Sequence, residues 1–269
     1  MRKLLVAGMM LGAVQGAQAA DLPILRGALP DTYGPRVVNW EGFYIGGQAG
    51  VGESDMNFTG ATRDVAAHLL ANTSIESGGS VSSWPVGSKA SARGDGFGGF
   101  AGYNSQWDDV VLGIEASYMH GKFGGTQTES MGRVFTDGQG YTDNITYTST
   151  ATMRLTDVGT FRARAGYAFG SFLPYIFGGL ALGQADIIRT ATITGTQDKV
   201  GGSPSHIDVA LSQTDGKYSH LVYGYSAGLG VDVNLTAGLF LRAEWEYIRF
   251  TSPIDTAVNT VRAGLGYKF

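Results

Sequence analysis

The chain ends in the ten-residue stretch 260–269, which reads Thr-Val-Arg-Ala-Gly-Leu-Gly-Tyr-Lys-Phe. In an extended strand successive side chains point to opposite sides, so the odd positions from Val261 to Phe269 form one apolar face. Arg262 and Lys268 lie on the other face. Such a strand fits a barrel that has lipid outside and a polar interior, and that closes when its last strand pairs with its first. The stretch therefore predicts a transmembrane β-barrel.

The N-terminus predicts export. Two basic residues precede an apolar run over residues 4–14, and Ala17-Gln18-Ala19 has the small-x-small pattern of a cleavage site. Residues 1–19 are therefore interpreted as a signal peptide for the Sec pathway, and residues 20–39, with three prolines, as an extended leader. No later stretch reaches about 18 uninterrupted apolar residues, so no transmembrane helix is expected. The barrel domain is assigned to residues 40–269.

The composition also bears on which partners and which kinds of membrane attachment are possible. The 19 lysines and arginines stand against 23 aspartates and glutamates, and loss of the two basic residues in the signal peptide leaves a net charge of about −6. Nothing here indicates nucleic-acid binding. The absence of cysteine excludes disulfides and a lipid-modified N-terminal cysteine, so membrane association has to come from the fold.

Period-two alternation recurs in eight segments. They are residues 40–51, 96–106, 110–120, a strand ending at 169, then 172–188, 223–235, 239–247 and 260–269. Tight turns at 107–109, 170–171 and 236–238 alternate with loops at 53–95, 122–150, 189–217 and 251–257. Within the second loop, residues 144–150 are rich in Thr and Tyr, so the fourth strand is also expected to start well above the membrane. Outer-membrane barrels show this asymmetry. The fold class predicted is all-β: an eight-stranded antiparallel up-and-down transmembrane β-barrel with short periplasmic turns and long external loops. A soluble exported β-sandwich is the rival fold.

Aromatic residues gather near the predicted tight turns, as expected for an interfacial girdle. The set is Trp40, Phe43, Tyr103, Trp107, Tyr167, Phe169, Phe172, Tyr175, Tyr267 and Phe269. A second girdle at the other end is expected to include Tyr118, Trp245 and Tyr247.

Four segments, at residues 40–47, 161–167, 174–181 and 264–269, resemble the small OmpA-like outer-membrane β-barrel proteins of alphaproteobacteria, the group of RopB-type and hemin-binding surface proteins. The resemblance covers the chain from Trp40 onward. It implies location in the Gram-negative outer membrane and insertion by the barrel-assembly machinery, which in such families recognises a last strand ending in Phe. Tyr267 and Phe269 are the residues assigned to that signal. The peptidoglycan-binding domain of full-length OmpA proteins is not expected.

Eight charged residues fall on the inner parity of the predicted strands. They are Glu115, Arg162, Arg164, Arg242, Glu244, Glu246, Arg262 and Lys268. Side chains roughly fill an eight-stranded barrel, and buried charges have to be paired. These residues are therefore predicted to form a lumen charge network that holds the barrel closed. The alternative is that some pairs open and gate a narrow solute path.

The remaining motifs give little evidence for a ligand or a reaction. The run Gly94–Gly99 matches a dinucleotide fingerprint in its letters, but it opens a predicted strand and lacks the helix that such a site needs. Heme contacts by His68, His120, His206 and His220 are implied only by the family resemblance, because their spacing defines no common site. No catalytic constellation stands out. No enzyme activity, metal or cofactor is expected.

The function predicted is an integral outer-membrane barrel with a structural and surface-interaction role. A small porin-like channel or a heme-binding uptake protein is the alternative. The expected partners are outer-membrane lipid and lipopolysaccharide, the barrel-assembly machinery and an extracellular partner of the long loops. In the first loop the apolar patch Val65–Leu70 is expected to form a helical turn that either packs on its own barrel or docks to a partner.

Overall fold

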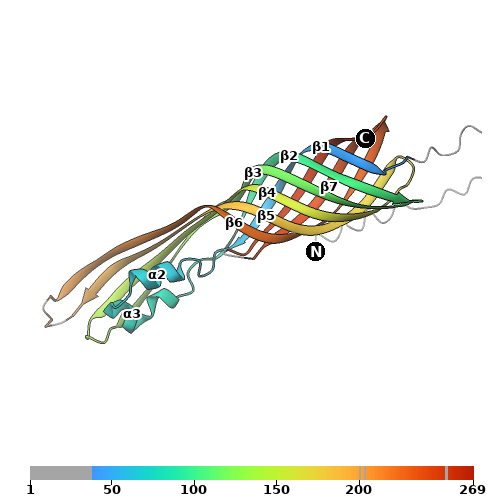
Figure 1. Ribbon diagram of the computed structural model, residues 1–269. Coiled ribbons are helices and arrows are strands. Elements are labelled where there is room, and N and C mark those ends of the chain that lie inside the picture. Colours follow the sequence, from blue (N-terminus) through green and yellow to red (C-terminus); the bar gives the residue numbers. More distant parts are fainter. Residues whose placement is uncertain (1–37, 200, 203, 252–253) are drawn as a thin grey trace, which may run out of the picture. The chain divides into compact units, whose positions relative to one another are not determined.

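The computed structural model describes residues 38–199, 201–202, 204–251 and 254–269; the predicted signal peptide and nearly all of the leader lie outside them. Eight antiparallel strands form a closed ring, each paired with its neighbours (Figure 1). They are β1 Gly42–Asn57, β2 Lys89–Trp107, β3 Val110–Thr136, β4 Thr142–Tyr167, β5 Phe172–Asp198, β6 His206–Thr236, β7 Leu239–Phe250 and β8 Thr256–Lys268. The predicted fold class is confirmed. Within these residues no helix has the length and apolarity needed to span a membrane.

The last strand closes the ring on the first, as the sequence predicts. Ala49 of β1 lies opposite Ala263 of β8, and Ile45 lies opposite Tyr267. The outward side chains of β1 are apolar from Phe43, which is 67% exposed, to Val51, which is 64% exposed. Nine residues in this span match the length of a strand that crosses a bilayer at a tilt. The first charged outward residue beyond them is Glu53, which marks the polar edge of the belt.

The three predicted tight turns are present, and their backbone conformations explain their positions. Ala237 and Gly238 both have positive φ, 41° and 89°, which is the requirement of a two-residue hairpin turn that matches the twist of its strands. Asp108 and Gly170 also have positive φ, at 50° and 58°. Asp and Gly are residue types that adopt this conformation at low cost.

Two of the predicted loops are wrong. Residues 122–150 and 189–217 are mostly strand, because β3 continues to Thr136 before β4 begins at Thr142, and β5 continues to Asp198 before β6 begins at His206. The four strands stay paired with one another out to these ends. Along these extensions threonine alternates with apolar residues. Threonine is polar, but it is β-branched and therefore favours strands.

The first predicted loop is a small helical layer. It contains α2 Arg63–Leu69, α3 Ser74–Gly79 and the 3₁₀ turn η1 Val81–Ser83. Thr73 caps α3, since its Oγ1 accepts a hydrogen bond from Glu76 N at 3.2 Å. The helical turn predicted at Val65–Leu70 corresponds to α2. These helices contact the extended parts of β3, β5 and β6, beside which they lie in Figure 1.

The helices and the strand extensions share a core, and we call this unit, residues 58–88, 126–152 and 188–216, the head. The buried hydrophobic side chains of this shared core are Val65, Ala66, Leu70, Ile75, Val81, Trp84, Val86, Ile145, Tyr147, Ala191, Ile193 and Val209. The apolar patch in the first loop therefore packs on its own chain. Burying it there removes the exposed apolar surface that would otherwise call for a partner.

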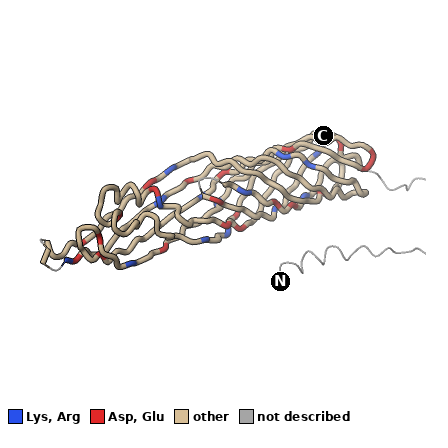
Figure 2. Tube along the Cα trace, turned by 90° about the horizontal axis from the view of Figure 1, so that it is seen from below, with Lys and Arg blue, Asp and Glu red and all other residues tan. Residues whose placement is uncertain are grey.

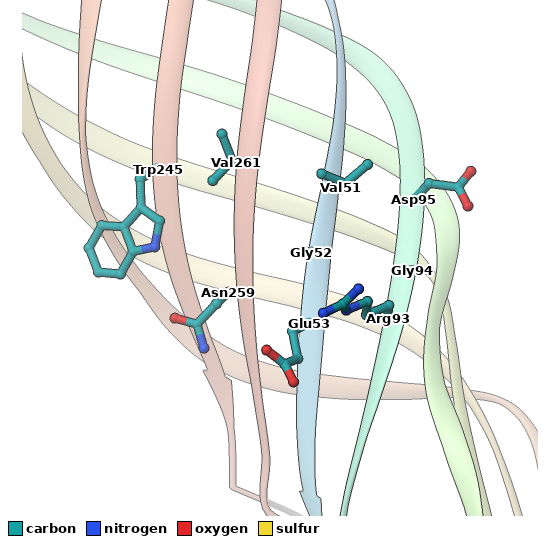
Figure 3. A pocket seen from close by; sticks show the side chains of 9 residues that line it. All are labelled: Val51, Gly52, Glu53, Arg93, Gly94, Asp95, Trp245, Asn259 and Val261. Atoms are coloured by element: carbon teal, nitrogen blue, oxygen red, sulfur yellow. The ribbon is translucent and has the colours of Figure 1, made fainter. Parts of the chain in front are cut away.

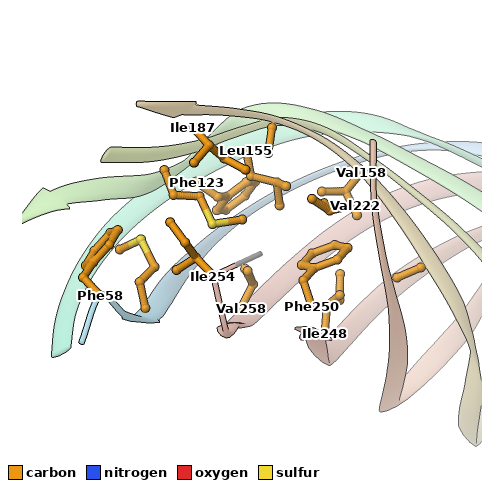
Figure 4. Packing of buried hydrophobic residues seen from close by; sticks show 14 of the residues in the cluster. Phe58, Phe123, Leu155, Val158, Ile187, Val222, Ile248, Phe250, Ile254 and Val258 are labelled. Atoms are coloured by element: carbon orange, nitrogen blue, oxygen red, sulfur yellow. The ribbon is translucent and has the colours of Figure 1, made fainter. Parts of the chain in front are cut away.

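The barrel interior is layered, as the inward side chains of β3 show in order. Val111 belongs to an apolar cluster at the end with the tight turns, Glu115 to a charged layer, and Met119 and Phe123 to a second apolar cluster. Figure 4 shows this second cluster filling the space inside the strands, with Phe123, Leu155 and Phe250 pointing inward from different strands.

Two residues placed in the periplasmic girdle by the sequence lie inside the barrel instead. Trp40 is 2% exposed and packs edge-on against Phe240, with ring centroids 6.2 Å apart. It precedes β1, so strand parity does not govern it. Tyr175 is buried because its neighbours Pro174 and Ile176 take the outward positions of β5. The other members of that girdle that lie in strands or turns, such as Phe43 and Trp107, are exposed.

Candidate functional site

The centre of the barrel holds four arginines and four carboxylates, and their charges balance. The lumen charge network comprises Arg162, Arg164, Arg242, Arg262, Glu115, Asp232, Glu244 and Glu246. None of these residues is more than 4% exposed. Charged residues lie along the barrel strands as well as at their ends (Figure 2). Because buried charges are tolerated only when paired, equal numbers of opposite charges permit this arrangement.

Arg162 is the hub of the network. Its Nε donates to Glu115 Oε1 at 3.0 Å, its Nη2 to Glu244 Oε1 at 2.7 Å and its Nη1 to Glu246 Oε1 at 3.3 Å. The guanidinium also lies 4.0 Å from the centroid of the Phe177 ring. One arginine on β4 thus connects carboxylates from β3 and β7, which stand on opposite parts of the ring.

Arg164 and Arg242 hold a second carboxylate, Asp232. Arg242 Nε donates to Asp232 Oδ1 at 2.8 Å, and Arg164 Nη2 donates to Asp232 Oδ2 at 2.7 Å. Arg242 Nη1 also reaches Glu115 Oε2 at 2.7 Å, which joins the two halves of the network. These bonds are charge-assisted and fix the arginine planes.

Two tyrosines complete the network. The hydroxyl of Tyr44 donates to Glu115 Oε2 at 2.7 Å, and that of Tyr175 donates to Glu244 Oε1 at 2.6 Å. The Tyr175 ring lies under Arg164, 3.7 Å from its Cζ. Glycine makes room for both rings: a Cβ on Gly102 would come within 2.4 Å of the Tyr44 hydroxyl, and one on Gly230 within 2.7 Å of the Tyr175 ring. Small residues on facing strands are therefore part of this site.

Seven of the eight charges assigned to the lumen from the sequence meet here, and one does not. Arg262 pairs with Glu246 and with Glu244, the latter at 3.3 Å. Lys268 is the exception: its Nζ donates to the backbone oxygen of Glu41 at 3.0 Å, at the exposed end of the last strand. The inward parity of Lys268 is real, but the interior at that level is already filled by Trp40 and Phe240.

Asp232, Tyr44 and Tyr175 also belong to the network, although they are not among the residues predicted for it from the sequence. A signal for Asp232 was present, because it alternates with the outward Val231 and Val233 and lies opposite Arg242. Parity also places Tyr44 inward, between the apolar Phe43 and Ile45, but a tyrosine carries no charge that would assign it to an ionic network.

The outer wall has a depression formed by residues of β1, β2, β7 and β8 (Figure 3). Val51, Val261 and Trp245 line its apolar side, and Glu53, Arg93 and Asn259 line its polar side. It is open to the surroundings and lies where the apolar belt gives way to charged residues. The arrangement suits the boundary between acyl chains and headgroups, where tryptophan is enriched.

The four histidines are not brought together. His68 lies in α2, and His120 lies on β3 with its Nδ1 2.9 Å from Asp157 Oδ1. His206 and His220 are both on β6, 14 residues apart, which corresponds to about 45 Å along an extended strand. Within the described residues no group of three or more potential metal-binding side chains forms. Heme contact therefore stays a prediction from the resemblance.

His206 has a local environment of its own at the far end of β6. Its Nδ1 lies 2.5 Å from Asp198 Oδ1 and its Nε2 3.2 Å from Asp208 Oδ1. These hydrogen bonds raise the pKa of His206 and lower the pKa of Asp198. The Gly94–Gly99 run lies inside β2, which continues to Trp107, so the helix required by a dinucleotide site does not follow it.

The closed ring, the outward apolar belt and the interior filled with paired charges define a transmembrane β-barrel. Residues 4–269 match the family described as outer membrane protein beta-barrel domain, and the chain belongs to this family. It is an integral protein of the Gram-negative outer membrane.

The chain is similar to outer-membrane proteins of Brucella and Rhizobium, and the share of the chain that aligns differs among them. The chain is 27% identical over 176 residues to the 25 kDa outer-membrane immunogenic protein of Brucella ovis, a match that covers 64% of this chain and 62% of that protein, under two thirds of it. It is 24% identical to the 22 kDa outer membrane protein of Rhizobium leguminosarum bv. viciae, over 86% of this chain and 79% of that protein. It is 25% identical to the 31 kDa outer-membrane immunogenic protein of Brucella melitensis over the whole of both.

Among solved structures, the attachment invasion locus protein Ail of Yersinia pestis is similar, with 14% identity and a TM-score of 0.37. The alignment covers 85% of this chain and 99% of that chain.

Proposed function

We propose that the protein is a non-conducting, non-enzymatic structural barrel that displays a folded head outside the cell. The observation that carries this proposal is the layered interior. Two apolar clusters flank a charged layer, and each layer contains side chains with nearly no solvent exposure. A solute path would have to cross all three layers, and side chains roughly fill a ring of eight strands.

The head supports the display role. From Tyr118, near the edge of the belt, β3 continues for 18 residues to Thr136, which corresponds to about 60 Å of extended strand. Three other strands accompany it, and the helices cover one face with a shared apolar core. A rigid projection of this kind holds its surface clear of the lipid headgroups, where an extracellular partner can reach it.

The proposed partners in assembly follow from the last strand. Tyr267 and Phe269 are 46% and 76% exposed, and their rings meet edge-on with centroids 5.3 Å apart. Phe269 N donates to Phe43 O at 2.9 Å, so the terminal residue is fixed against β1. We propose export through the Sec pathway and recognition of these two aromatics by the barrel-assembly machinery. Outer-membrane lipid and lipopolysaccharide would then surround the belt.

Planar-bilayer recording tests the closed lumen. The refolded mature protein is expected to give no stable unitary conductance, because the charged layer and both apolar clusters block the path. Folding is checked first by heat-modifiable gel migration, and a large porin added to the same bilayer controls for insertion. A stable channel in the refolded protein would favour the porin-like alternative instead.

A further inference from the structure

The far end of the head, where α3 lies beside the ends of β3 and β4, contains two buried carboxylates (Figure 1). Asp143 on β4 is 0% exposed, and Asp137, which follows β3, is 6% exposed. Asp143 lies opposite Phe135, and Asp137 is two residues beyond Phe135, so both side chains point to the same side of the sheet. Residues at such diagonal positions are about 7–8 Å apart, a distance that one ion bound by both carboxylates can bridge.

Each of these carboxylates has one oxygen in hydrogen bonds and one without. Asp137 Oδ1 accepts from the backbone N–H groups of Gln139 and Tyr141, both at 2.9 Å. Asp143 Oδ1 accepts from Gln197 Nε2 at 2.8 Å. The Oδ2 atoms of Asp137 and Asp143 are both buried and have no hydrogen-bond partner among the described residues. Buried polar atoms of this kind are uncommon, because each has lost its hydration without a replacement.

Two neutral side chains connect the carboxylates into one site. Gln197 Nε2 also donates to Ser74 Oγ at 3.3 Å, and the Ser74 hydroxyl lies close enough to Asp137 to stabilise its charged form. We call Ser74, Asp137, Asp143 and Gln197 the tip site. Its members come from α3, from the β3–β4 hairpin and from β4 and β5, so the tip site lies where the helical layer meets the sheet.

No positive charge within the described part of the chain compensates the tip site. In the lumen charge network each of the four buried carboxylates is paired with arginine, but neither Asp137 nor Asp143 forms an ion pair with a described residue. Lys199 reaches the same hairpin, yet its Nζ donates to the backbone oxygen of Gln139 at 2.6 Å. Buried carboxylates are tolerated when they are paired or when they coordinate a metal, and the first condition is not met here.

The two carboxylates differ in how readily they ionise. Burial opposes ionisation of Asp137, but the Ser74 hydroxyl and the backbone N–H groups of the hairpin outweigh it and lower the pKa of Asp137. Burial raises the pKa of Asp143, and the negative charge of Asp137 adds to this, while the hydrogen bond from Gln197 offsets only a part. The tip site therefore holds one negative charge on Asp137 and gains a second when Asp143 ionises.

We propose that the tip site binds a hard divalent cation of the Ca²⁺ type through Asp137 Oδ2, Asp143 Oδ2 and the Ser74 hydroxyl. Carboxylate, hydroxyl and water oxygens are the ligands that Ca²⁺ takes, and sites in extracellular modules bind it with a Kd of about 10⁻⁴–10⁻³ M. The bound ion connects α3 to β3 and β4 and so stabilises the head against opening. Binding requires only the folded head, so it holds whether or not the lumen conducts.

Protease protection of residues 58–88 tests the proposal. The mature protein is refolded into phosphocholine vesicles, which contain no lipopolysaccharide that would itself bind Ca²⁺, and is cut with a protease that needs no Ca²⁺. Ca²⁺ is expected to slow cleavage of the head at least fivefold relative to EGTA, with half of the effect at about 0.1–1 mM. Asp143→Asn should abolish this dependence. Glu129→Gln, at an exposed position of the head, is the matched control and should retain it.

Calorimetric titration with CaCl₂ measures binding directly, with heat-modifiable migration as the check of folding. The wild type and Glu129→Gln should show one saturable site, which Asp143→Asn should lack. No saturable binding by the wild type up to about 10 mM Ca²⁺ would overturn the proposal. So would a Ca²⁺ effect that persists in Asp143→Asn, because the ion would then bind elsewhere. Protection by Asp143→Asn in EGTA, together with no Ca²⁺ effect in the wild type, would identify a proton as the occupant instead.

Discussion

Replacing Arg162 with methionine is expected to lower the free energy of unfolding of the barrel by about 3–5 kcal/mol, because removal of one partner from a buried ion pair leaves charges without compensation. Arg162 contacts Glu115, Glu244 and Glu246, all of which are at most 3% exposed. Methionine retains much of the side-chain volume, so the loss reports on charge more than on a cavity. Urea unfolding in lipid vesicles, followed by heat-modifiable gel migration, measures it.

Two further variants separate this cause from general damage. Arg249→Met removes a half-exposed pair with Asp255, at 2.9 Å, and should cost less than about 1 kcal/mol. The double change Arg162→Met with Glu244→Gln restores the charge balance and should recover part of the loss. If Arg162→Met instead left the unfolding midpoint unchanged and raised ion conductance, the network would be a gate and the closed-lumen interpretation would fail.

The barrel could be predicted from the sequence because its physical requirement repeats along every strand. Lipid outside and paired charges inside impose a period of two, so residues such as Arg162 and Glu244 reveal their side by parity alone. Parity says nothing of depth along the barrel axis. For this reason Lys268, which has inward parity but sits at the exposed rim, and Trp40, which precedes the strand, were placed wrongly.

The head could not be predicted in this way. Thr146, Thr148 and Thr150 are β-branched, which allows the early start of β4 to be expected, but their polarity gives no sign that the residues between them are buried. Their apolar alternates, Ile145 and Tyr147, are covered by helices from a segment more than sixty residues earlier. Such a long-range contact leaves only a weak local trace, which here was the short patch predicted to form α2.

Truncating Trp84 to alanine is expected to unfold the head while the barrel stays assembled. Trp84 is 3% exposed, its Nε1 donates to Gly79 O at 2.9 Å, and its ring meets that of Phe135 edge-on at 6.3 Å. Removal of a buried tryptophan costs about 3–5 kcal/mol, a large share of what a core of this size can supply. Limited proteolysis of whole cells should then cut within residues 58–88, where the wild type is protected.

The barrel provides the internal control, because the lumen charge network and the apolar clusters around it do not include Trp84. Heat-modifiable migration of Trp84→Ala should therefore equal that of the wild type, and Ser83→Ala, at an exposed neighbouring position, should leave the protease pattern unchanged. Loss of both the head and the barrel in Trp84→Ala would show that they fold as one cooperative unit. Independent loss of the head would mean that strands β3–β6 pass through two separately stabilised units. Lipid and buried ion pairs would be sufficient to hold the barrel, and the apolar core beneath the helices would be sufficient to hold the head.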